Sequence, residues 1–216
     1  MVTVMASDPF SAVVETTNLA VDTLGRLDVL KAVKSKLVNN PDRAAAHLVE
    51  VLDIIDAVYQ EMRKQILDFS TLDFSSDTET GKSRRHLRNL KTDGLATQIS
   101  DADAACNKIK NIYKTHLDAW FQRVLNETEQ DQLRNLFDEM SIMDFSLVGA
   151  MHGLSSTLGT ASAAILSALD QSGSAAAKKL IGAIEHQLDA ALKNLSGQFA
   201  GLKSLRSDFV AISNAL

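Results

Sequence analysis

The position of the prolines constrains this chain more than any other feature. Pro9 and Pro41 are its two prolines, and none occurs from Asp42 to Leu216. Proline removes a backbone donor and clashes with the preceding helical turn, so long helices avoid it, whereas proteins built from many short strands and turns usually contain it. The proline-free stretch therefore predicts an all-α protein and argues against a β-sandwich or barrel.

The spacing of the apolar side chains predicts five long helices. Apolar residues recur at steps of three and four, as one face of an α-helix requires. The expected helices run over about residues 9–37, 41–66, 93–124, 126–169 and 175–212. Long helices with near-heptad steps and short connections predict an elongated antiparallel bundle with coiled-coil-like packing.

The breaks between these helices suggest one helical-bundle domain over residues 1–216. Pro9 and Pro41 suit the first position of a helix, where the missing N–H costs nothing. A stretch rich in Ser, Thr and Asp, over about residues 70–83, predicts a mobile loop. Residues 84–91 fit either the first turns of the third helix or a short separate helix.

Composition narrows the function classes. The net charge of −5 argues against generic nucleic-acid binding. Cys106 is the one cysteine, which excludes an internal disulfide, and its heptad position indicates a small buried side chain.

No basic and apolar leader is visible at the start, so we expect a cytoplasmic location. Nucleotide-binding and catalytic motifs are absent from the sequence, which favours a non-enzymatic protein that needs no cofactor.

One long stretch carries no charge. Residues 145–169 include no Asp, Glu, Lys or Arg, and 15 of these 25 residues are Gly, Ala, Ser or Thr. Small residues let two helices approach closely, so we expect a close-packing helix face made by Gly149, Gly153, Ser156 and Thr160. A tight contact within the chain is the first interpretation, self-association is the second, and membrane insertion is the third.

A basic run follows the predicted loop. Lys82, Arg84, Arg85, Arg88 and Lys91 have no acidic residue among them. If a helix starts here, these charges lie at the unfavourable end of its dipole. The run is therefore either a solvated surface or a site for an anion or an acidic partner.

Histidines offer one alternative site. Helical bundles build metal sites from facing helices, and His47, His116 and His152 are candidates for a three-histidine site. The Glu-x-x-His pattern of di-iron bundles is missing, and the reversed order, His47-x-x-Glu50, occurs once. Isolated histidines without a metal are the competing interpretation.

These observations lead to one expected function and two alternatives. We expect an interaction, scaffold or regulatory module that acts through helix–helix association, with a protein partner or as a homodimer. The first alternative is a ligand-binding or metal-binding bundle that uses His116 near Tyr113 and Trp120. The second is a membrane-active helical protein, similar to pore-forming proteins, that unpacks residues 145–169.

Overall fold

The computed structural model describes residues 29–39, 42–92, 94–139 and 147–216. These residues form eight α-helices and one π-helical turn, with no strand among them, which confirms the all-α prediction. The elements in chain order are α2 (Leu30–Asn39), α3 (Ala44–Ser70), α4 (Asp77–Thr92), α5 (Gly94–Ile112), η2 (Tyr113–Leu117), α6 (Asp118–Val124), α7 (Glu127–Glu139), α8 (Leu147–Ser172) and α9 (Ser174–Ser213).

Two of the five predicted helices are divided. The fourth, expected over 126–169, is two helices, α7 and α8, with residues 140–146 outside the described part of the chain. No Pro or Gly lies in residues 140–146, so the usual signals of a helix end are missing there. The third is interrupted by η2, since its backbone widens to a π-helical turn before α6. Pro9 and Pro41 lie outside the described residues.

The loop predicted over residues 70–83 is shorter, because α4 already begins at Asp77. The Ser76 hydroxyl accepts a hydrogen bond from the backbone N–H of Glu79 at 3.3 Å, which caps the first turn. Upstream, the backbone N–H of Asp73 donates to the buried Ser83 hydroxyl at 2.9 Å, and that hydroxyl donates to the Asp73 carbonyl at 2.8 Å. Phe74 is buried as well, so the short loop is held against α4.

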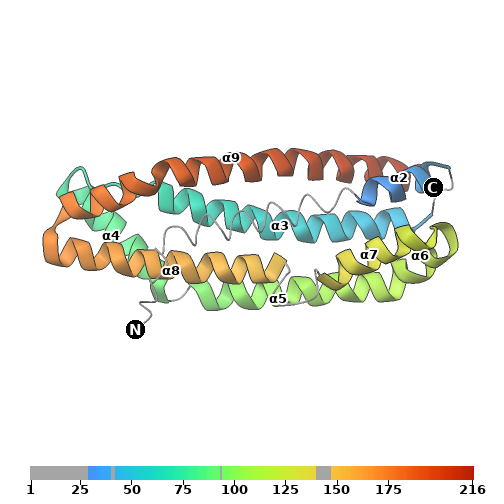
Figure 1. Cartoon of the computed structure of the whole chain (residues 1–216), viewed down its shortest axis with the longest axis horizontal. Coiled ribbons are helices and arrows are strands. Elements are labelled where there is room, and N and C mark those ends of the chain that lie inside the picture. Colours follow the sequence, from blue (N-terminus) through green and yellow to red (C-terminus); the bar gives the residue numbers. More distant parts are fainter. Residues whose placement is uncertain (1–28, 40–41, 93, 140–146) are drawn as a thin grey trace, which may run out of the picture.

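The long helices lie side by side (Figure 1). α9 runs antiparallel to α3, as the edge-to-face contact of Tyr59 with Phe199 and the ion pair of Asp53 with Arg206 show. α8 contacts α3, α4, α5 and α9. The buried side of α3 is mostly apolar and includes Leu48, Leu52, Ile55, Tyr59, Met62, Ile66 and Phe69, with Gln65 buried among them.

The turn between α8 and α9 depends on Gly173, whose φ of 78° is in the left-handed region. A Cβ at this position meets open space, so the cost of substitution is conformational rather than steric crowding. We expect Gly173→Ala to lower the free energy of unfolding by about 1–2 kcal/mol. Urea denaturation measures this, and Gly81→Ala within α4 is the control.

Gly81 is an exposed glycine inside a helix and also has open space around its Cβ position. Alanine should therefore raise the free energy of unfolding at this position by about 0.5–1 kcal/mol. Equal effects of the two substitutions would contradict a special role of the Gly173 backbone.

Candidate functional site

Two of the three predicted histidines come together. His47 lies in the first turn of α3 and His116 lies in η2, 69 positions later in the sequence. Their rings stack with centroids 4.0 Å apart and an angle of 7° between the planes. His116 is exposed and His47 is half-buried, so the pair lies at the surface of the bundle.

The π-helical turn positions His116. Tyr113 and Leu117, at its two ends, are both buried, while Thr115 and His116 between them are exposed. A π-helical turn inserts an extra residue into a helix, and such turns are frequent at functional sites. His116 thus lies on the exposed side of the turn, between two buried anchors and stacked on His47.

Charged groups surround the pair. Burial lowers the pKa of His47, and the neighbouring His116 lowers it further, while Glu50 and Asp42 oppose these effects. A carboxylate oxygen of Glu50 accepts a hydrogen bond from Lys108 Nζ at 3.0 Å, an ion pair that ties α3 to α5 close to the two histidines.

The lowered pKa of His47 predicts pH-dependent stability. The unfolded chain protonates His47 near its ordinary pKa of about 6.5, whereas the folded chain does so only at lower pH. The unfolded state then binds more protons, so the contribution to stability is complete above about pH 6.5 and decreases as the pH falls below it. Urea denaturation at about pH 7.5 and about pH 5.5 measures how much the free energy of unfolding falls on acidification. This decrease should be smaller for His47→Gln than for the wild type. Identical losses in both proteins would contradict this.

The third predicted ligand, His152, lies in α8, and its side chain is outside the described residues. Among the side chains that are described, no group of three or more His, Cys, Asp or Glu could hold a metal ion. Next to the histidine pair, Tyr113 belongs to a filled aromatic cluster rather than to a cavity. Its ring stacks on Phe137 with centroids 4.5 Å apart, and its hydroxyl donates to Asp118 at 3.1 Å.

The basic run of α4 does not form one open cationic patch. Lys82 pairs with Glu79 at 2.6 Å, and Arg84 pairs with Asp170 of α8 at 3.0 Å. Arg85 and Arg88 are exposed, and the side chain of Lys91 lies outside the described residues. Because α4 begins at Asp77, these residues follow its first turn, and the expected conflict with the helix dipole does not arise.

The close-packing face predicted on α8 is not the face that packs within the chain. Ser156 and Thr160 are exposed and Gly153 is half-buried, while the burial of Gly149 is not described. The buried side carries the large apolar residues together with Ala and Ser, namely Leu154, Ser155, Leu158, Ala161, Ser162, Ile165 and Leu169. Burying the leucine side chains stabilises the fold more than close approach of the small residues would, so the leucines face the core.

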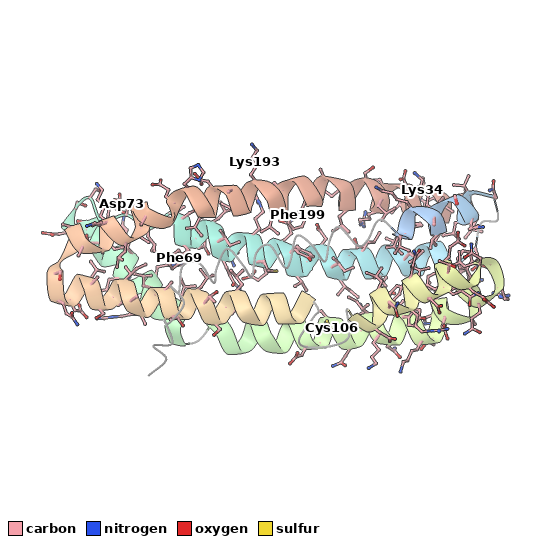
Figure 2. All side chains as sticks on the ribbon, in the orientation of Figure 1. Lys34, Phe69, Asp73, Cys106, Lys193 and Phe199 are labelled. Carbon is pink, nitrogen blue, oxygen red and sulfur yellow. The ribbon has the colours of Figure 1, made fainter. Side chains whose placement is uncertain are left out.

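The longest helix, α9, has two different faces. Figure 2 shows Phe199 directed toward α3 and Lys193 directed away from the bundle. Small residues line part of the exposed side at intervals of seven, and we call them the small-residue stripe: Ala183, Ala190, Gly197, Ser204 and Ala211, all exposed. At Gly197 a Cβ atom would meet nothing within 4 Å. The stripe was not predicted, although its seven-residue interval is visible in the sequence.

A hollow of about 710 Å³ lies between α2 and α9 beside the stripe. Val38 contributes to its wall and is 57% exposed, one of two large hydrophobic side chains exposed in the described part of the chain. The remaining lining residues come from both helices and are Lys31, Lys34, Ser35, Asn39, Gly201, Ser204, Leu205 and Asp208. A surface of apolar and small side chains is thus open to a partner along the C-terminal half of α9.

Comparison of the chain with protein-family models, with curated proteins and with solved structures finds no match. Within the described ranges, no helix combines the length and the apolarity needed to cross a membrane.

Proposed function

We propose that this chain is a non-enzymatic interaction module that works through helix–helix association, and that it forms a homodimer through α9. The observation that carries the proposal is the small-residue stripe. It extends over 28 positions, from Ala183 to Ala211, which corresponds to about 42 Å of helix. Exposed small residues over such a length allow a second helix to approach closely.

The stripe is symmetric about Gly197. When a second copy of α9 runs antiparallel and crosses at this residue, Ala190 faces Ser204 of the copy, and Ala183 faces Ala211. A two-fold interface requires this kind of self-complementarity, because the same surface serves both partners. The seven-residue interval also matches the spacing of a coiled coil, which is the packing expected for this bundle and its dimer.

Charge and shape next to the stripe support the same arrangement. Asp189 precedes Gly197 in the sequence, Lys203 follows it, and both side chains are exposed. When two copies cross antiparallel at Gly197, Asp189 of one copy therefore lies within two positions of the level of Lys203 of the other copy. Opposite charges at these levels favour the antiparallel register. The hollow that contains Val38 adds apolar surface for the partner to cover. The expected cytoplasmic location is part of this proposal and rests on the sequence.

Disulfide trapping tests the register directly. A residue on a two-fold axis faces its own copy, so Gly197→Cys should form a disulfide between two chains under mild oxidation. Cys106, the one native cysteine, is buried and should not interfere. The matched control is Gly81→Cys, at an exposed helical glycine on α4. If neither variant forms a disulfide between two chains, or if both form it equally, the proposed crossing is contradicted.

A further inference from the structure

We propose that, in the dimer, His186 of each copy enters the hollow between α2 and α9 of the other copy and donates a hydrogen bond to Asp208 there. The inference rests on the proposed dimer through α9, and it adds a contact that makes this dimer tighter at acidic pH. His186 is exposed on α9, and Asp208 is half-buried in the wall of the hollow.

The two residues lie at the same level in the proposed dimer. Asp208 follows Gly197 by 11 positions and His186 precedes it by 11, so an antiparallel crossing at Gly197 places them opposite each other. Asp208 comes four positions after Ser204 of the small-residue stripe. His186 comes four positions before Ala190 of the same stripe. Residues four apart are neighbours on one face of a helix, so both side chains border the interface. The two-fold axis creates two such contacts, each about 16 Å along the helix from Gly197.

Asp208 has room and an acceptor for the histidine. Its Oδ2 accepts a hydrogen bond from Lys34 Nζ of α2, an ion pair that holds the carboxylate in the hollow. A carboxylate accepts on both oxygens, so Oδ1 can accept from an imidazole N–H of the other copy. The hollow of about 710 Å³ is large enough for the ring. Gly201 and Ser204 are the small residues on its α9 side, which lets the second helix come close.

The charges at the contact give it a dependence on pH. A histidine imidazole takes up its proton between about pH 5 and 8, whereas an aspartate carboxylate stays ionised over this range. The protonated imidazole forms the stronger, charge-assisted bond with the carboxylate. The other charged groups nearby are two acids next to the histidine on its own helix and two lysines of α2 in the other copy, namely Glu185, Asp189, Lys31 and Lys34. Together with Asp208 the acids outnumber the lysines, so acidification should strengthen the dimer.

Sedimentation velocity of the full chain over a dilution series, at about pH 7.5 and about pH 5.5, tests this. Acidification also reduces the net charge of −5, which favours association of any variant, so the change is compared between proteins. The dissociation constant of the wild type should fall about tenfold more than that of His186→Gln or Asp208→Asn, because the wild type gains two charge-assisted bonds per dimer.

The matched control is Asp53→Asn. Asp53 is also an exposed aspartate in an ion pair between two helices, with Arg206 of α9, but it lies on α3. This variant should keep the response of the wild type to pH.

Three results would overturn the contact. A dimer that responds to pH equally in the wild type and in His186→Gln rejects it and leaves the dimer through α9 standing. A loss of response in Asp53→Asn as large as in Asp208→Asn rejects it as well. A wild-type chain that is monomeric at both pH values rejects the proposed function, and this contact with it.

Discussion

Gly197→Glu is expected to convert the protein from a dimer to a monomer. Gly197 lies at the centre of the small-residue stripe, where the proposed two-fold axis brings the two copies of the residue together. Glutamate there would place two carboxylates against each other in the interface and would also prevent close approach of the helices. Juxtaposed like charges cost several kcal/mol, which corresponds to a loss of affinity of at least about 100-fold. Sedimentation velocity over a dilution series measures the change.

The matched control is Gly81→Glu. Gly81 is also an exposed glycine within a helix, and a Cβ at either position meets open space, so both substitutions should leave the fold of the single chain intact. Gly81→Glu should sediment like the wild type. A dimeric Gly197→Glu protein, or dissociation caused equally by both substitutions, would show that the stripe is not the interface.

Phe199→Ala is expected to have the largest effect on stability. Phe199 is 5% exposed and contacts Tyr59 of α3 edge to face, with ring centroids 5.6 Å apart. Truncation removes this contact and leaves a cavity between α9 and α3, which should lower the free energy of unfolding by about 3–5 kcal/mol. Urea denaturation at one fixed protein concentration measures it, because the stability of a dimer depends on concentration.

Lys193→Ala is the control on the opposite face of the same helix (Figure 2). Its side chain is exposed, so its truncation should change the free energy of unfolding by no more than about 0.5 kcal/mol. If Phe199→Ala costs as little as Lys193→Ala, the packing of α9 against α3 is not as described.

The sequence predicts the helices whose apolar spacing is regular. α9 follows the expected range of 175–212 closely, and apolar residues that recur along it, such as Leu188, Leu195 and Phe209, are buried. The helix expected over 126–169 corresponds to α7 and α8, with residues 140–146 between them outside the described part of the chain and no Pro or Gly there to signal a helix end. The start of α4 was missed because its first turn consists of Asp, Thr and Glu, residues that are also common in loops.

The sites depend on contacts that periodicity does not encode. Sequence alone selected His47 and His116 as two of three histidines, but their meeting requires the antiparallel pairing of α3 with α5 and the π-helical turn that presents His116. The small-residue face was expected on α8, where residues 145–169 carry no charge. Ser156 and Thr160 of that face are exposed, and α9 carries a further exposed stripe, which Lys and Asp side chains interrupt and make less conspicuous in the sequence.

The most direct test of the proposed function is the molar mass of the purified wild-type chain in solution. Size-exclusion chromatography with light scattering should give about twice the chain mass of 23.4 kDa, and the value should stay constant down to low micromolar concentration, as expected for a dimer with a dissociation constant below about 1 μM. A mass of 23.4 kDa at every concentration, including the highest that can be reached, would contradict self-association through α9.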